Sequence, residues 1–286
     1  MPVASSYERL NLPQMGEPAD LVMSPSDEKH IGRGYMRKIR QYLDLVTDTE
    51  INRYVQSIGE RLVATRPDLN AADFTFFVVR NPEINAFALP GGYVGINSGL
   101  IVAASNEAEL ASVIAHETAH ITQRHIARLY ASQGNTGYKT AATILAAILL
   151  SQQSAQAGQA ALITGLAASR KSAINYTRIH EYEADRIGIQ LLSDAGYNPR
   201  GMVDFFEVLR RRVALNTTEQ MEFLRTHPLT NNRISEAKNN SARLSNPVGL
   251  QDTADFQLHQ MKLRAMAIKA AMLTQLSQGN YSSKVR

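Results

Sequence analysis

The sequence predicts an α+β fold that is mainly helical, with a small β-sheet or hairpin beside one central helix. Three observations lead to this prediction. Apolar residues recur at helical spacing in several segments, and the strand signals are concentrated between residues 74 and 97. The helix expected after them carries the pentapeptide His116-Glu117-Thr118-Ala119-His120. With 286 residues, 44% of them hydrophobic, the chain can form one large folded domain or two modest ones.

The composition excludes several classes of protein. The formal net charge is +4 without a basic tract, which argues against nucleic acid as a partner. There is no cysteine, so neither a disulfide framework nor a thiolate site is expected. No apolar run reaches the roughly 20 residues that span a bilayer, and the first residues lack the apolar core of a signal peptide. We therefore expect either a cytoplasmic protein or a sequence that begins after a removed signal peptide.

The N-terminal third is expected to be an arm followed by two helices. Residues 1–25 contain four prolines and few periodic apolar positions, so they are interpreted as an extended arm. Ser26 is the expected cap of a helix over residues 27–42. A second helix, over residues 48–65, has apolar residues three and four apart and ends before Pro67.

The strand signals follow directly. Residues 74–80 are aromatic and β-branched, which is typical of a buried strand. Residues 85–89 and 93–97 flank a Pro-Gly-Gly turn and predict a β-hairpin. An exposed edge of this hairpin could hold an extended peptide through main-chain hydrogen bonds, and a purely structural hairpin is the equal alternative. The candidate substrate-binding residues on this edge are Asn85, Ala86 and Phe87.

Residues 106–128 are the most informative segment of the sequence. Asn106 and the acid three residues later form an N-cap signature, and neither Gly nor Pro interrupts the segment, which predicts a helix. On this helix His116 and His120 share one face, and Glu117 stands about 100° away. Two imidazoles and a neighbouring carboxylate are the two ligands and the base that a zinc hydrolase needs. We therefore expect a zinc site rather than a coincidental pair of histidines.

Residues 131–175 separate this helix from the next informative segment. They are rich in Ala, Gly, Ser and Gln, and their apolar run is too short to cross a bilayer. We interpret them as a helical hairpin or mobile lid near the site. A peripheral contact with a membrane surface is the alternative.

The third zinc ligand should come from a helix expected over residues 176–195, because catalytic zinc takes three protein ligands and one water. Glu181 lies seven residues before Gly188, on the face that packs in the core. Glu183 lies about 200° from Glu181 around the axis and faces elsewhere. A carboxylate on a packed face needs a cation, so the helical phase favours Glu181 over the other candidates, and a solvated acidic helix is the alternative. The candidates considered are His180, Glu181, Glu183 and Asp185.

Two neighbours of Glu181 receive other roles. Asp185 is four residues further on and faces the same side. It is placed to accept the second ring N–H of a zinc-bound histidine and so to fix its tautomer. His180 is expected to be a surface neighbour.

Together these motifs resemble a known family. The sequence is similar to the zinc metallopeptidases related to HtpX and the CAAX prenyl endopeptidases, and within them to the β-barrel assembly-enhancing protease (BepA-like) branch. The resemblance covers roughly residues 26–245. Its motifs are residues 116–120, 181–188, 195–199 and 226–228, with Asn85 to Ala88, Gly91-Gly92 and Gln123-Arg124-His125 pointing to the branch.

The resemblance implies a gluzincin-type metallopeptidase domain over residues 26–245 with one Zn²⁺ per chain. The zinc would be held by His116, His120 and Glu181, with Glu117 as general base and Asp185 behind the ligands. Such enzymes hydrolyse peptide bonds of unfolded or misassembled proteins. For the BepA-like branch these are outer-membrane proteins, and the outer-membrane assembly machinery is a further expected partner.

The resemblance also bears on the two ends of the chain. BepA-like proteins are periplasmic, which favours a removed signal peptide over a cytoplasmic location. They carry a C-terminal array of tetratricopeptide repeats. Residues 246–286 contain an Ala-, Met- and Leu-rich helical stretch, which resembles the first helix of such an array, cut short. A natural single-domain member of the family is the alternative.

His227 is the remaining candidate for a catalytic role. It should lie in a loop between a helix over residues 201–214 and one beginning near Asn231. The oxyanion that develops during hydrolysis needs a hydrogen-bond donor; His227 is the first candidate and Arg233 the second. A sharper hypothesis is that His227 binds the zinc in a resting state and switches activity off. The alternative is a buried structural histidine.

Two other functions stay open. One is a chaperone-like peptide-binding module with a silent or latched zinc site, acting in quality control. The other is a zinc hydrolase of a non-peptide amide. Glu117 together with an open fourth position at the zinc favours an enzyme over a binding module.

Overall fold

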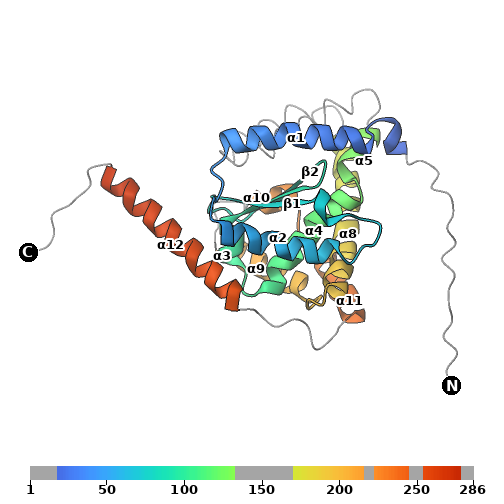
Figure 1. Cartoon of the computed structure of the whole chain (residues 1–286). Helices are drawn as coiled ribbons and strands as arrows, with labels where there is room; N and C mark the ends of the chain where they lie inside the picture. The colour runs from blue at the N-terminus through green and yellow to red at the C-terminus, as the bar shows by residue number, and fades with distance from the viewer. Residues whose placement is uncertain (1–17, 133–169, 216–221, 245–253, 278–286) are drawn as a thin grey trace, which may run out of the picture.

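The computed structural model describes residues 18–132, 170–215, 222–244 and 254–277 of the chain. In these residues the protein is mainly helical, with one three-stranded sheet that has helices on both of its faces (Figure 1). The predicted α+β class is therefore confirmed. Residues 1–17 of the arm expected over residues 1–25 and most of the expected lid, residues 133–169, lie outside the described residues.

Helices open the described part of the chain. These are the short 3-10 helix η1 (Pro18–Leu21), α1 (Pro25–Tyr42) and α2 (Thr49–Val63). Ser24 caps α1, because its hydroxyl accepts from the Asp27 N–H while the Asp27 carboxylate accepts from the Ser24 N–H. The prediction of Ser26 as the cap is wrong by two residues, since a proline suits the first helical turn and Pro25 starts the helix. Asp48 caps α2, because its carboxylate accepts from the Glu50 and Ile51 N–H groups.

The sheet follows the short 3-10 helix η2 (Ala71–Asp73) and confirms the predicted hairpin. Its strands are β1 (Thr75–Val79), β2 (Ala86–Leu89) and β3 (Tyr93–Asn97), in the order β1-β3-β2. β2 and β3 are antiparallel, and β1 adds parallel to β3 with Thr75 opposite Tyr93. The turn between β2 and β3 needs glycine, because Gly91 and Gly92 have φ angles of 77° and 92°.

The two faces of the sheet are covered by different helices. Phe77 and Phe87 point to the α1 side, where they pack with Met36 and Ile39. The opposite face joins the main core with α2 and the central helix. Strands buried on both faces read as continuous apolar runs, which is why residues 74–80 look so hydrophobic in the sequence.

The metal-motif segment is not one continuous helix. The chain forms α3 (Ser98–Ala103), then α4 (Glu107–Thr122), then α5 (His125–Ser132). Asn106 caps α4 through the Glu109 N–H, as predicted. The helix breaks at Arg124, whose φ is 51°, so helical continuity through residue 128 is not observed. The guanidinium of Arg124 binds Glu28, Asp20 and the Met23 carbonyl, and these contacts hold this left-handed residue.

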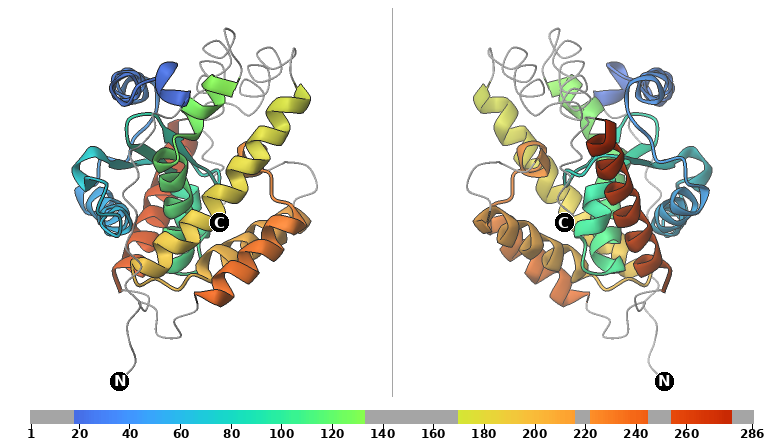
Figure 2. Two further views of the ribbon diagram at one scale, coloured as in Figure 1. Left: turned by 90° about the vertical axis from the view of Figure 1, so that its right-hand side faces the viewer. Right: turned by 90° about the vertical axis from the view of Figure 1, so that its left-hand side faces the viewer.

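Further helices form the second half of the domain, and the two longest of them pack against α4. These helices are α8 (Arg170–Asp194), α9 (Gly201–Leu215), α10 (Glu222–Thr226) and α11 (Asn231–Arg243). Figure 2 shows α8 crossing alongside α4, with α9 and α11 beside each other beneath them. Gly188 allows this close crossing, because a Cβ there would lie 3.2 Å from the His116 backbone nitrogen. The crossing sets Glu181 and Asp185 of α8 opposite His116 and His120 of α4.

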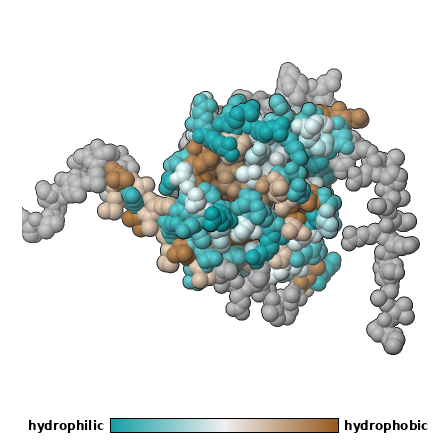
Figure 3. All heavy atoms as spheres, in the orientation of Figure 1, coloured by the Kyte–Doolittle hydropathy of each residue, from teal (hydrophilic) through white to brown (hydrophobic). Residues whose placement is uncertain are grey.

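Helix α12 (Ala254–Ser277) is attached to the domain by its first half. The Gln260 amide donates to the carbonyls of Ile101 and Ala104, and His259 stacks on Tyr54 with ring centroids 4.5 Å apart. The second half extends away from the domain and exposes apolar side chains, including Ile268 (Figures 1 and 3). Within the described residues, no helix combines the length and the apolar character that crossing a membrane requires.

Candidate active site

Four side chains from three parts of the chain converge on one point. His116 and His120 come from α4, Glu181 from α8, and His227 from the loop after α10. One ligand atom from each lies within 4.8 Å of the others. The Nε2 atoms of His116 and His120 are 3.1 Å apart, and each lies 3.4 Å from a Glu181 oxygen. His227 Nδ1 is 3.1 Å from both carboxylate oxygens of Glu181.

This donor set fits a zinc ion. Imidazole nitrogen and carboxylate oxygen are zinc ligands, and two histidines with one glutamate form the set of the HExxH hydrolases. The cluster is buried apart from His120, whose side chain is 13% exposed. Burial, the largest influence, lowers the pKa of His120 and keeps its ring neutral, which is the form that binds a metal.

Asp185 orients His116 from behind, in the position expected from the helical phase. Its Oδ1 lies 3.0 Å from His116 Nδ1, which leaves Nε2 facing the cluster. Burial alone would lower the pKa of His116, but hydrogen bonds and charges of Asp185 and Glu181 outweigh it and raise this pKa to about 10. The ring is therefore held by an acceptor that also increases its basicity.

Arg233 binds the two carboxylates and is not available as an oxyanion donor. Its Nε and Nη2 donate to the two Asp185 oxygens at 2.7 and 2.8 Å, and its Nη1 lies 2.9 Å from Glu181. The residue is only 2% exposed. Burial would raise the pKa of Glu181, but the charges of His227 and Arg233 outweigh it and hold this pKa well below its ordinary value. The expected donor role of Arg233 is thus corrected to that of a buried counter-ion.

Glu117 lies beside the cluster of His116, His120, Glu181 and His227, and one of its carboxylate oxygens makes no hydrogen bond within the described residues. This oxygen is the buried Oε1, and His227 Nε2 lies 3.4 Å from it. A buried carboxylate oxygen of this kind is costly unless it meets water or substrate. Glu117 is therefore placed to act on a group bound at the cluster.

Comparison with known proteins agrees with this geometry. The family model described as peptidase family M48 matches residues 50–241. The chain belongs to peptidase family M48. It is 39% identical over 255 residues to the beta-barrel assembly-enhancing protease of Escherichia coli K12, covering 89% of this chain and 52% of that protein.

Two further relatives widen the comparison. The beta-barrel assembly-enhancing protease of Yersinia pestis is 36% identical over 274 residues, covering 94% of this chain and 56% of that protein. The mitochondrial metalloendopeptidase OMA1 of Schizosaccharomyces pombe is 32% identical over 181 residues, covering 63% of this chain and 50% of that protein. The chain spans about half the length of these curated relatives. The resemblance stated from the motifs is therefore confirmed.

In this M48 domain His227 closes the fourth side of the cluster. Its ring stacks on Phe223 with centroids 4.8 Å apart, and its backbone N–H donates to the Phe223 carbonyl. The ring stands between Glu117 and Glu181, with Nδ1 3.3 Å from His116 Nε2. Arg233 fixes Pro228, the residue after His227, by donating to its carbonyl. The prediction that His227 lies at the metal site agrees with this position.

The far side of His120 carries residues that sequence reasoning missed. His125 Nδ1 lies 2.9 Å from His120 Nδ1, and the other His125 nitrogen lies 3.2 Å from Glu183. His180, expected at the surface, is 4% exposed and stacks on His125 with centroids 4.1 Å apart. That expectation is wrong because α5 turns back against α8 after the break at Arg124 and covers the ring.

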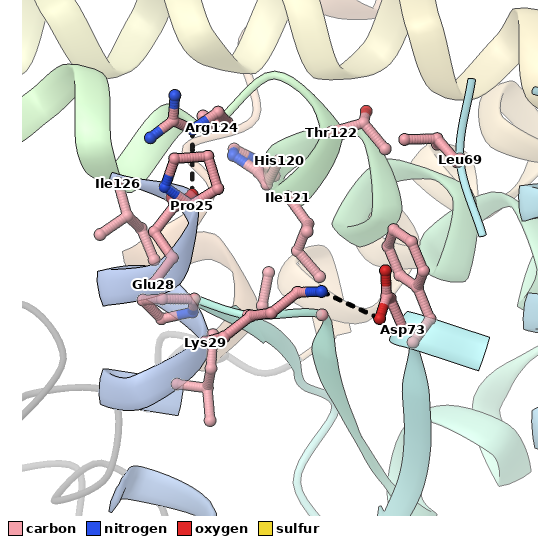
Figure 4. A pocket seen from close by; sticks show the side chains of 16 residues that line it. Pro25, Glu28, Lys29, Leu69, Asp73, His120, Ile121, Thr122, Arg124 and Ile126 are labelled. Atoms are coloured by element: carbon pink, nitrogen blue, oxygen red, sulfur yellow. Dashed lines mark hydrogen bonds and ion pairs between the residues drawn. The ribbon is translucent and has the colours of Figure 1, made fainter. Parts of the chain in front are cut away.

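The hairpin edge expected to hold substrate is covered. Asn85, Ala86 and Phe87 are each at most 3% exposed, since β2 is buried along its whole length. An exposed edge is therefore wrong for this conformation, and the substrate role of these residues is only a proposal. A cavity of about 230 Å³ instead opens beside His120. Figure 4 shows Lys29 extending toward Asp73 at this cavity, with His120 and Ile121 on the α4 side.

Proposed function

We propose that this chain is a zinc-dependent endopeptidase whose zinc is held by His116, His120 and Glu181. The observation that carries the proposal is the convergence of these three side chains, from two helices 61 to 65 positions apart, beside the unpartnered oxygen of Glu117. Bound zinc would supply Lewis acidity, which polarises a peptide carbonyl and brings the pKa of water toward neutrality.

The chain's own residues would move the protons. Glu117 would accept a proton from the attacking water and return it to the leaving amine. His227 Nε2 faces the same side as Glu117, so it could donate to the oxyanion that forms on the carbonyl. Arg233 and Asp185 would hold the ligand side chains in place and would not touch the substrate.

The proposed substrates are unfolded or misassembled outer-membrane proteins in the periplasm. Two relatives bear the name beta-barrel assembly-enhancing protease, and the motif resemblance implies the same compartment. The outer-membrane assembly machinery is the proposed partner. The cavity beside His120 is a route by which a polypeptide side chain could approach the site.

Casein cleavage by purified, zinc-loaded protein tests the activity. Glu117→Gln should lower cleavage by roughly 10²–10⁴-fold, the contribution of a general base. Glu107→Gln is the matched control, because Glu107 is also buried on α4 but binds the hydroxyls of Tyr54 and Tyr197. Equal activity of the wild type and Glu117→Gln would contradict the proposed base.

We also propose that His227 acts as an autoinhibitory fourth zinc ligand in the resting state. Its Nδ1 lies 3.3 Å from His116 Nε2 and 3.1 Å from both Glu181 oxygens, so it would be the fourth protein ligand of the ion and would leave no position for water. His227→Ala separates this latch from the donor role: cleavage rises if a latch is lost and falls if a donor is lost.

The same observation favours one alternative function. A cluster closed by His227 suits a chaperone-like peptide-binding module with a latched zinc. If neither the wild type nor His227→Ala cleaves casein while both still bind unfolded polypeptide, the result would support this module over the peptidase.

A further inference from the structure

We infer that His125 and Glu183 form a hydrogen-bond relay that orients the zinc ligand His120 and strengthens its hold on the metal. We call these two residues the His125 relay. The inference rests on the metal site proposed above and assigns new positioning residues to it. Neither belongs to the HExxH pentapeptide or to the ligand set.

The atoms at the relay allow a single consistent assignment of protons. The Nε2 atom of His120 faces His116 and Glu181, so its lone pair is the one available to a metal. The proton of a neutral His120 ring must then be on Nδ1, which lies 2.9 Å from His125 Nδ1. His125 therefore accepts at Nδ1, carries its own proton on Nε2, and donates it to Glu183 Oε2 at 3.2 Å.

The helix break makes this contact available. If α4 continued as one helix, residue 125 would be rotated about 140° from residue 120 and would face away from it. The left-handed conformation of Arg124, with φ at 51°, turns α5 so that His125 comes back to His120. A non-glycine residue in this conformation is uncommon and costs energy, and such strain is concentrated at functional sites.

The relay is rigid at both ends. His125 is 3% exposed and its ring lies almost parallel to that of His180, with 9° between the planes. Glu183 is fixed in turn by Arg128, whose Nη1 donates to the same oxygen at 2.8 Å. A fixed acceptor can impose an orientation on His120, whereas a free one could not.

The two histidines of the pentapeptide are thus supported in different ways. His116 has a carboxylate, that of Asp185, 3.0 Å from its Nδ1, while His120 donates to a neutral imidazole that is itself hydrogen-bonded to a carboxylate. Such outer partners of ligating histidines contribute roughly 10- to 100-fold to metal affinity. The His125 relay therefore supplies for His120 what Asp185 supplies for His116.

Zn²⁺ dissociation constants, measured by chelator competition on the purified chain, test the relay. His125→Leu removes the acceptor and should weaken Zn²⁺ binding by roughly 10- to 100-fold. His125→Asn places an oxygen near the former Nδ1 position and should restore binding to within about threefold of the wild type. Glu183→Ala, at a position whose side chain is 21% exposed, should weaken binding on the order of threefold, because His125 keeps its acceptor nitrogen. His259→Leu is the matched control, since His259 is also buried and stacked but lies on α12.

The visible spectrum of the Co²⁺-loaded protein supplies a second readout. It should shift for His125→Leu and stay unchanged for His259→Leu, because only the first alters the field at a ligand. Wild-type affinity in both His125→Leu and Glu183→Ala overturns the relay. Equal losses in His125→Leu and His125→Asn also overturn it, because they indicate packing rather than an acceptor. A wild type that binds no Zn²⁺ would instead refute the proposed metal site.

Discussion

Replacing Arg233 by leucine should destabilise the zinc-free protein more than any exposed arginine substitution. The guanidinium makes three charged contacts of 2.7 to 2.9 Å, two to Asp185 and one to Glu181. Both carboxylates are buried, so Arg233→Leu leaves two buried negative charges that face only the protonated ring of His116. Removing one partner of a buried pair costs about 3–5 kcal/mol. That is a large part of the 5–15 kcal/mol by which domains are typically stable.

Urea unfolding at pH 7 in the presence of chelator gives the free energy of unfolding directly. Arg200→Leu is the matched control, because Arg200 pairs with Asp204 at the surface and its loss should cost about 0–1 kcal/mol. Arg233→Lys keeps the charge without the bidentate geometry. Its loss of free energy of unfolding should therefore fall between those of Arg233→Leu and Arg200→Leu. A loss below about 1 kcal/mol for Arg233→Leu, no larger than for Arg200→Leu, would refute the counter-ion role.

Three further substitutions test other parts of the structure. Ser24→Ala should lower the free energy of unfolding by about 1 kcal/mol and Ser26→Ala by much less, measured by urea unfolding, because only Ser24 caps α1. Gln260→Leu leaves two carbonyls without their donor, so amide hydrogen exchange in α12 should accelerate while that of α4 stays slow. Burial, then the charge of Arg128, lowers the pKa of His180 to about 4. The unfolded chain therefore takes up protons first as the pH falls from 6.5 to 4, and the Tm of the zinc-free wild type should fall more steeply there than that of His180→Phe.

Positions that depend on local periodicity could be predicted from the sequence. Asn106 caps α4, and the phase of α8 selected Glu181 and Asp185, because spacing along one helix fixes which side chains share a face. The hairpin was predictable from its glycine turn. That β1 joins β3 in parallel was not predicted, since the pairing is a contact between distant segments.

Three of the misses have a common physical origin. The break at Arg124 carries neither Gly nor Pro, and it is held by Asp20 and Glu28, which are about one hundred residues away in sequence. His180 looked exposed because its cover, His125, reaches it only after that break. Arg233 was assigned to an oxyanion because the sequence does not show that Asp185 and Glu181 already engage it. Each of these three misses is a tertiary contact that local propensity does not encode.

The charges around the cluster explain why a divalent cation suits it and lead to one more measurement. Four carboxylates, Glu117, Glu181, Glu183 and Asp185, face two guanidinium groups, those of Arg128 and Arg233, which leaves a net charge of −2 with neutral histidines. One Zn²⁺ neutralises this charge.

Without metal, the proton on His116 supplies part of the positive charge that zinc would bring. The His116 pKa of about 10 keeps the ring protonated at pH 7. Zinc must displace this proton, since it binds only the neutral ring. Zn²⁺ affinity should therefore increase with pH between 7 and 10 by close to tenfold per unit, and Zn²⁺ binding at pH 7 should release about one more proton from the wild type than from Asp185→Asn. Calorimetry in buffers of different ionisation enthalpy measures that number, and equal release from the two proteins would show that Asp185 does not set the charge of His116.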